Sequence, residues 1–247
     1  MNKRQLLNVP LTGADIQARA RAELPNVTFR GGVLRAKTGN AVDLVFVIDT
    51  TGSMSDKIEG VLATCEEFLR NFAVLGLDYR VGIVAFGDLT VPGDSIVAMP
   101  FMKELEMIQK ELRSVPRYGG GGNDGESSLE AVHAALDMPY RAEAVKVCIL
   151  ITDEPALHIN HFPAATTATL NRREVITYVI SPAIDYFKAM ANQTGGEWLQ
   201  ITSAADFSSL LSMLRELSRN MAKIVTDVHL LAHGSVQTYL KLGKPKV

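Results

Sequence analysis

The sequence predicts an α/β fold of the Rossmann-like, doubly wound type, in which a mostly parallel six-stranded sheet is covered by helices on both faces. Two observations predict this class. Strongly apolar segments rich in β-branched residues occur at 42–48 and 145–152, as is typical of strands buried on both faces. Segments between such strands carry apolar residues spaced by three and four, which indicates amphipathic crossover helices.

The elements of the first half follow in order. The central strand is predicted at 42–48 (VDLVFVI), and the apolar spacing from 56 to 72 predicts the helix that follows it. Two further strand segments, 79–86 and 95–101, flank a Pro-Gly turn, so we expect a hairpin whose second strand is an antiparallel edge strand. Helices are then predicted at 105–115 and 129–136, with a glycine-rich segment between them.

The second half continues the alternation. Strands are predicted at 145–152, 175–181 and 198–201, with a helix at 184–191 and a long closing helix over 203–221. We therefore expect one domain at 42–222. An N-terminal extension, 1–41, is expected to contain a short helix at 13–24 and a possible hairpin around Gly31 and Gly32. Residues 223–247 are expected to be a C-terminal tail ending in the solvated basic segment KLGKPKV.

Composition restricts the classes of partner. The chain has 247 residues, 47% of them hydrophobic, and a formal net charge of -2, so no broad basic surface is expected for nucleic acid or an anionic membrane. Both cysteines lie in apolar segments, where a thiol usually behaves as a small buried hydrophobe. No run of eighteen apolar residues and no signal-peptide core is found. These features predict a cytoplasmic protein.

Polar residues follow two of the predicted buried strands. Directly after 42–48, the pattern DxTxS places Asp49, Thr51 and Ser53 at alternating positions of a tight turn, and Asp153 follows the strand at 145–152. In an open α/β sheet, ligands bind beyond the carboxyl ends of the strands, where the winding reverses. A carboxylate and two hydroxyls on one loop suit a hard cation such as Mg²⁺, with Asp153 contributing through a bound water.

A third segment is expected to reach the same point. The loop GGGGNDGES at 119–127 precedes a predicted helix, and its glycines allow close approach of the backbone. Asn123 and Asp124 offer side-chain oxygens in this loop. The predicted metal ligands are therefore Asp49, Thr51, Ser53, Asn123, Asp124 and Asp153.

The segments FVIDTTGSM, GGGGNDGES and ILITDEP, in this order, resemble the von Willebrand factor A family with its metal-ion-dependent adhesion site, over residues 42–221. The segments RVGIVAFGD, MPF and ITDEPALH are similar to an intracellular-type subgroup that usually shows GGGDxPE and ITDAPPH. In this chain Asn123 occupies the position of the subgroup's loop Asp, and Gly125 occupies the position of its Pro. The ligand expected from that loop is therefore either Asn123 or Asp124. The Thr that family members often carry there is absent.

The resemblance implies a function as well as a fold. It implies a bound Mg²⁺, or Mn²⁺ or Ca²⁺ in its place, that coordinates an Asp or Glu of a partner protein. It implies a binding module and no enzyme. A cation held mainly by hydroxyls and water keeps net positive charge and an open position, which a guest carboxylate can fill.

Two other functions compete with this one. A strand that ends in Asp also resembles the haloacid dehalogenase type of Mg²⁺-dependent phosphotransferase or phosphatase, but that chemistry needs a second carboxyl group where Thr51 stands. The chain could also be a regulatory subunit that works with a chelatase-like ATPase. The sequence does not separate this role from that of a free binding module.

Structural interpretations also exist for single residues. Ser53 and Asp56 fit a helix-capping box, and Asp124 and Glu126 fit acids favoured in a first helical turn. Asp88 flanks a strand, where a solvated surface position is expected. His158 and His161 follow Asp153 without the further ligands that zinc requires, so rim contacts are expected.

Overall fold

The structure is a computed structural model that describes residues 27–30, 33–36, 41–73, 77–120, 122, 125–201 and 207–242. It divides into two compact units, Met1–Gly39 and Asn40–Val247. In the smaller unit, β1 (Val27–Arg30) pairs with β2 (Val33–Ala36) in antiparallel orientation, so the predicted hairpin is confirmed. The helix predicted at 13–24 lies outside the described residues.

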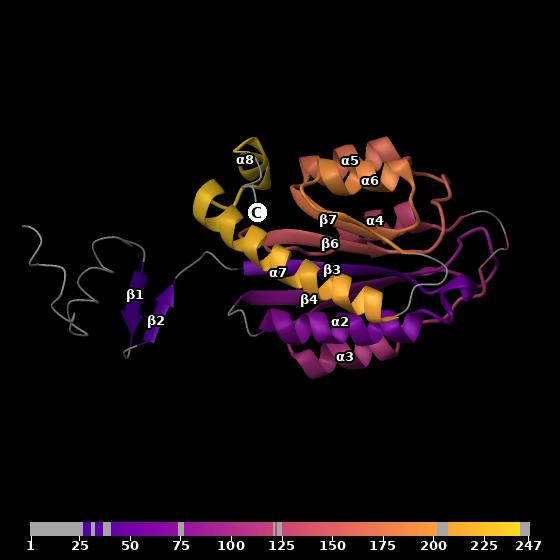
Figure 1. Cartoon of the computed structure of the whole chain (residues 1–247), viewed down its shortest axis with the longest axis horizontal. Helices are drawn as coiled ribbons and strands as arrows, with labels where there is room; N and C mark the ends of the chain where they lie inside the picture. The colour runs from indigo at the N-terminus through magenta and orange to yellow at the C-terminus, as the bar shows by residue number, and fades with distance from the viewer. Residues whose placement is uncertain are drawn as a thin grey trace, which may run out of the picture. The chain divides into compact units, whose positions relative to one another are not determined.

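The larger unit contains a six-stranded sheet with the order β5-β4-β3-β6-β7-β8 (Figure 1). Five strands are parallel, and β5 pairs antiparallel with β4 at one edge, which confirms the predicted fold class. The strands are β3 (Ala41–Asp49), β4 (Asp78–Phe86), β5 (Ile96–Met102), β6 (Val145–Ile151), β7 (Val175–Ser181) and β8 (Trp198–Gln200).

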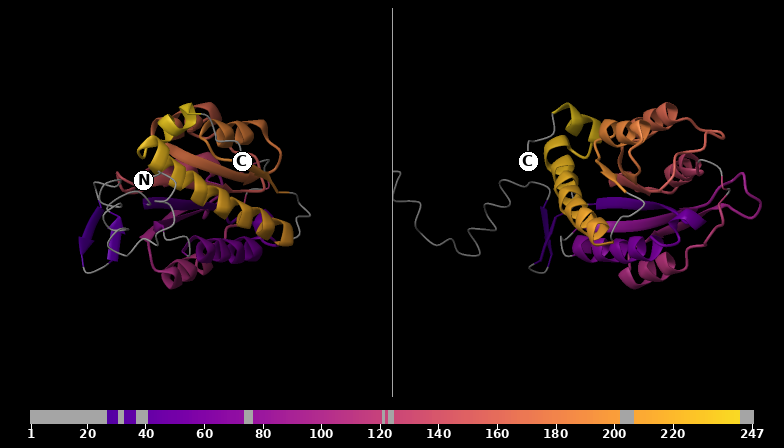
Figure 2. Two further views of the ribbon diagram at one scale, coloured as in Figure 1. Left: turned by 60° about the vertical axis from the view of Figure 1, so that its left-hand side comes forward. Right: turned by 45° about the vertical axis from the view of Figure 1, so that its right-hand side comes forward.

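Helices cover both faces of this sheet. Figures 1 and 2 show α2 and α3 on one face, with α7 crossing the same side, and α5 and α6 on the other. The helical segments are η1 (Gly52–Met54), α2 (Ile58–Ala73), α3 (Leu105–Arg113), α4 (Ser128–Leu136), α5 (Pro163–Arg172), α6 (Asp185–Gln193), α7 (Phe207–Ala232) and α8 (Val236–Lys241).

Strand β3 divides the core into two layers. Its side chains alternate between the faces of the sheet, so Leu44 and Phe46 join the cluster under α2, α3 and α7 while Val45 and Val47 join the cluster under α4, α5 and α6. All four side chains are fully buried. The continuous apolar run in the sequence therefore reflects burial on both faces.

Helix α7 differs from the expected closing helix and tail. It continues through residue 222 to Ala232, and Val225, Val228 and Ala232 lie in the same core cluster as Leu44. Tyr239 of α8 joins that cluster as well. The residues from 223 to 242 thus pack on the sheet unit, because the apolar spacing of α7 continues beyond Met221. The last five residues of the predicted basic tail lie outside the described part.

Helix α5 has no counterpart among the predicted elements. Its sequence, PAATTATLNR, has few large apolar residues, and Thr166, Thr167 and Leu170 form its buried side. Pro163 stands in its first turn, where a proline costs no backbone hydrogen bond and its φ suits a helix. Apolar periodicity alone therefore could not reveal this helix.

Both cysteines, Cys65 and Cys148, are free and buried, as expected from their apolar segments. None of the described helices combines the length and apolar character that a membrane crossing requires.

Candidate metal-binding site

The predicted site lies where the winding of the sheet reverses. Strand β3 pairs with β4 on one side and with β6 on the other, while the chain passes from β3 to β4 first. The carboxyl ends of β3, β4 and β6 lie at the right-hand side of Figure 1. Asp49 ends β3 and Asp153 follows β6, so two chain segments about a hundred residues apart meet at this edge.

Four of the predicted ligands form one hydrogen-bonded chain. The Thr51 hydroxyl donates to Asp49 Oδ1 at 2.6 Å, and the Thr51 backbone N–H donates to the same oxygen at 3.0 Å. Thr51 Oγ1 lies 3.2 Å from Ser53 Oγ, which donates to Asp153 Oδ1 at 2.9 Å. The structure therefore brings Asp49, Thr51, Ser53 and Asp153 together.

Asp49 is a buried carboxylate with unusual surroundings. It is 0% exposed, and its second oxygen, Oδ2, accepts a hydrogen bond from the Thr152 hydroxyl at 2.7 Å. Burial raises the pKa of Asp49 to about 6, although hydrogen bonds from Thr51 and Thr152 act in the opposite direction. Within the described part of the chain, no Lys or Arg forms an ion pair with Asp49. A bound cation would therefore stabilise its charged form.

Thr152 and Lys57 are site residues that were not predicted. Thr152 is the first residue after β6, and β6 pairs with β3 so that Ile151 lies opposite Ile48. The Lys57 ammonium donates to Asp153 Oδ2 at 2.7 Å and to the Ser53 carbonyl at 2.8 Å. The only sequence signals were a hydroxyl residue directly before Asp153 and a basic residue one turn after Ser53. The carboxylate partners of both, Asp49 for Thr152 and Asp153 for Lys57, are 103 and 96 positions away in the chain.

The glycine-rich loop does reach the site. Gly52 N–H donates to the Gly119 carbonyl at 3.3 Å, and a Cβ at Gly52 would lie 2.8 Å from that oxygen, so only glycine permits this approach. Gly120 has φ of +75°. The proposed loop ligands Asn123 and Asp124 lie outside the described residues, and their role stays a prediction.

Glu126 belongs to the surroundings of the site. It is 5% exposed, and its Oε2 has no hydrogen-bond partner among the described residues. Burial, followed by the charges of Asp49 and Asp88, raises the pKa of Glu126 to about 8. A neutral Glu126 is thus expected near pH 7. The first-turn position expected for Glu126 did not account for the influence of the Asp49 charge on it.

The structure contradicts two of the structural interpretations offered for single residues. Asp88 is 0% exposed, and its Oδ1 accepts hydrogen bonds from the backbone and hydroxyl of Thr90, because the loop after β4 folds back on itself. The Ser53 hydroxyl donates to Asp153 and caps no helix, and α2 begins at Ile58. His161 stacks on His133 with ring centroids 3.5 Å apart.

The donor set fits a hard cation. Within the described part of the chain, no group of three His, Cys, Asp or Glu side chains could hold a metal ion. Here the candidate ligands are two carboxylates and two hydroxyls, whose oxygens already lie 2.6–3.2 Å apart. Mg²⁺ prefers oxygen ligands, keeps several waters, and needs only one or two protein carboxylates.

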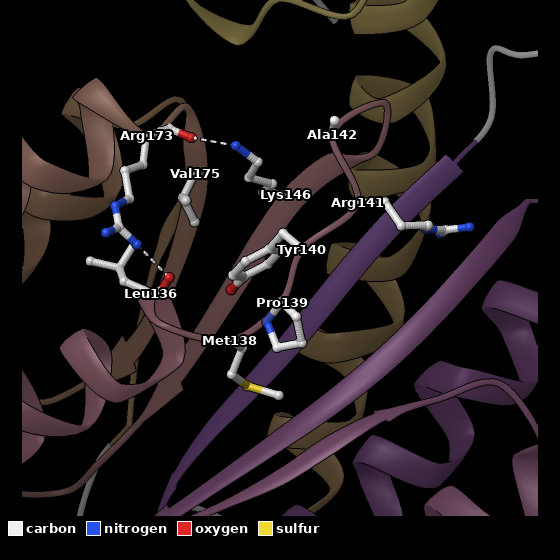
Figure 3. A pocket seen from close by; sticks show the side chains of 9 residues that line it. All are labelled: Leu136, Met138, Pro139, Tyr140, Arg141, Ala142, Lys146, Arg173 and Val175. Carbon is white, nitrogen blue, oxygen red and sulfur yellow. Dashed lines mark hydrogen bonds between the residues drawn. The ribbon is translucent and has the colours of Figure 1, made fainter.

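A pocket of about 400 Å³ at the amino-terminal ends of β6 and β7 is a weaker candidate (Figure 3). Arg141, Lys146 and Arg173 line it. Lys146 Nζ donates to the Arg173 carbonyl, and Arg173 Nη1 donates to the Leu136 carbonyl. Lys146 and Arg173 thus bind the carboxyl-terminal ends of α5 and α4, where positive charge is favourable. Arg141 forms ion pairs with Asp43 and Asp78, so structural contacts account for all three side chains.

The fold and the position of the site define a class of protein. The von Willebrand factor type A domain model matches residues 43–216, and the chain therefore belongs to the von Willebrand factor type A domain family. The sequence is 24% identical over 199 residues to alpha-protein kinase vwkA of Dictyostelium discoideum. This match covers 76% of the chain and 30% of the kinase.

A solved structure shows the same fold. The pilus adhesin SpaC from Lactobacillus rhamnosus GG, in its open conformation, superposes with a TM-score of 0.57 at 16% sequence identity. The match covers 74% of this chain and 30% of the adhesin. The chain thus corresponds to less than a third of either protein's length.

Proposed function

We propose that this domain is a divalent-cation-dependent protein-binding module. The observation that carries the proposal is the hydrogen-bonded chain Asp49–Thr51–Ser53–Asp153, which joins the ends of two neighbouring strands. These residues would hold Mg²⁺, or Mn²⁺ or Ca²⁺, with a loop ligand from Asn123 or Asp124.

The cation would supply positive charge and an open coordination position. Asp49 and Asp153 carry two negative charges, but the Lys57 ammonium offsets that of Asp153, so the protein would neutralise a divalent ion only in part. An Asp or Glu of a partner protein could then complete the coordination through a charge-assisted, directional contact. The loops around the site would select which partner is accepted.

Removal of Asp49 tests the metal site. In the full chain, Asp49→Ala is expected to abolish Mg²⁺ binding in titration calorimetry, because it removes the buried carboxylate. The matched control is Asp56→Ala in the same loop, whose side chain is 73% exposed and is expected to leave the affinity unchanged. Undiminished Mg²⁺ affinity of Asp49→Ala would refute the assignment.

Partner binding is tested by chelation. Proteins captured from native lysate by the wild-type chain are expected to elute with EDTA and to be absent from an Asp49→Ala column. A capture that is equal on both columns would contradict the role of the cation in binding. Partners that prove to be subunits of an ATPase would place the domain in a regulatory assembly of the chelatase-like kind.

We infer a binding role without catalysis. The position where a haloacid dehalogenase-type phosphotransferase needs its second carboxyl is Thr51, whose hydroxyl donates to Asp49. The name of the Dictyostelium relative describes a protein of which this chain matches only 30%. Hydrolysis of p-nitrophenyl phosphate that depends on both Mg²⁺ and Asp49 would overturn this inference.

Two free buried thiols support the prediction of a cytoplasmic protein.

A further inference from the structure

Lys57 is a buried cation in direct contact with the candidate ligands. The residue is 8% exposed, and lysine is almost never so buried unless it is paired. Its ammonium donates to Asp153 Oδ2 at 2.7 Å and to the Ser53 carbonyl at 2.8 Å. Its ammonium also lies 3.5 Å from Asp56, whose side chain is 73% exposed, so solvent screens that second pair.

The contacts leave one oxygen of Asp153 for the site. Asp153 Oδ2 accepts from Lys57, while Oδ1 accepts from Ser53 on the side of the candidate ligands. Both side chains of the ion pair are only 11% exposed. Lys57 therefore holds Asp153 in position and adds one fixed positive charge beside the place that a cation would take.

We propose that Lys57 is a specificity-determining residue of the site, which weakens cation binding and strengthens the binding of a guest carboxylate to the loaded site. This inference rests on the proposed metal site. The fixed charge repels a divalent cation and attracts an anion, so it must act on the two ligands with opposite sign. The ion then binds weakly until an acidic group completes the site.

The experiment measures both ligands separately on the full chain. Mn²⁺ alone is the first probe, and its dissociation constant comes from the electron paramagnetic resonance signal of free Mn²⁺. Acetate is the second probe. Its displacement of Mn²⁺-bound water lowers the relaxation enhancement of water protons, with ionic strength held constant by sodium chloride. Wild type is compared with Lys57→Met, Lys57→Gln and Lys57→Arg.

The two neutral variants are expected to shift the constants in opposite directions. Mn²⁺ should bind about tenfold more tightly to Lys57→Met than to wild type, while half-displacement of water should need about threefold more acetate. Lys57→Gln should follow Lys57→Met, because it keeps a donor for Asp153 but loses the charge. Lys57→Arg keeps the charge and should stay within about twofold of wild type for both ligands.

A purely structural role would give a different result. If Lys57 only supports the loop, both neutral variants would weaken Mn²⁺ and acetate binding together, and this outcome overturns the inference. Tighter Mn²⁺ binding with unchanged acetate binding also overturns it, because the Lys57 charge would then have no effect on the bound carboxylate. A wild-type chain that binds no Mn²⁺ would instead refute the metal site itself, and the inference with it.

Discussion

Strand β3 carries two fully buried carboxylates near its opposite ends, Asp43 and Asp49, and their surroundings differ. Asp43 accepts hydrogen bonds from Arg80 Nε and Nη2 at 3.0 and 2.6 Å, and from the Arg141 backbone and Nε at 2.6 and 2.9 Å. Among the residues that the structure describes, Asp49 accepts hydrogen bonds from uncharged groups of Thr51 and Thr152.

The difference appears in the pKa directions. Although burial by itself would raise the pKa of Asp43, hydrogen bonds from Arg80 and Arg141 hold it below its ordinary value of 3.8. Burial dominates at Asp49 and raises its pKa to about 6. Two carboxylates that are both fully shielded from solvent thus have pKa shifts of opposite direction. Asp43 is a compensated charge that joins β3 to its neighbours, whereas Asp49 is an uncompensated one that suits a bound cation.

The largest expected effect is on stability at the compensated end. Asp43→Asn should lower the free energy of unfolding by about 3 kcal/mol, because the Arg80 guanidinium loses its buried charged partner and that of Arg141 is left with the half-exposed Asp78. Urea unfolding followed by circular dichroism measures this loss, with Asp49→Asn as the control on the same strand. A loss for Asp43→Asn no greater than that for Asp49→Asn would contradict the assigned difference.

The second effect is a pH dependence at the uncompensated end. Since the folded pKa of Asp49 is raised from 3.8 to about 6, the native state binds more protons than the unfolded state between these values. Stability from this group therefore falls as pH rises through that window. Relative to Asp49→Asn, the wild type in EDTA should lose about 2 kcal/mol between pH 4.5 and pH 7.5.

The sign of this pH effect is the critical result. Asp43, whose folded pKa is lowered, has the reverse behaviour: its stabilisation is present above its ordinary pKa and is lost as pH falls through the folded value. Paired unfolding curves of wild type and each variant at several pH values measure both. The same sign for both carboxylates would mean that their surroundings do not differ as described.

The smallest effect is expected at an exposed ion pair near Asp43. Lys103 Nζ lies 2.7 Å from Asp78 Oδ1, and the two side chains are 61% and 50% exposed. Lys103→Ala should change the free energy of unfolding by less than about 0.5 kcal/mol, because water screens the pair. A loss comparable to that of Asp43→Asn in the same urea assay would show that burial is not the deciding factor.

The sequence predicted the strands of the sheet better than the helices and the ends of elements. The β-branched run at 42–48 has a single reasonable interpretation because strands buried on both faces are apolar at every position. Helix α5 was missed because its buried side contains Thr166 and Thr167 in place of large apolar residues. The predicted closing helix ends at Met221, whereas Val225 and Val228 continue its apolar spacing.

The candidate ligands were predictable in part. Asp49, Thr51 and Ser53 form a local pattern, and Asp153 ends a recognisable strand. Thr152 was missed because its role depends on the register between β3 and β6, which places it beside Asp49. Asp88 was expected at the surface, since a loop acid is usually solvated, but the fold buries it completely.

The sequence by itself determined the fold class, the family and the turn that carries Asp49, Thr51 and Ser53, because each follows from local periodicity or a short motif. The tertiary structure decided the electrostatics of the site. The charge of Lys57 meets Asp153 across 96 positions of the chain. Whether a buried carboxylate accepts from two arginines or from uncharged groups depends on which strands pair. Electrostatic energies depend on distance in space and on burial, and neither is a property of local sequence.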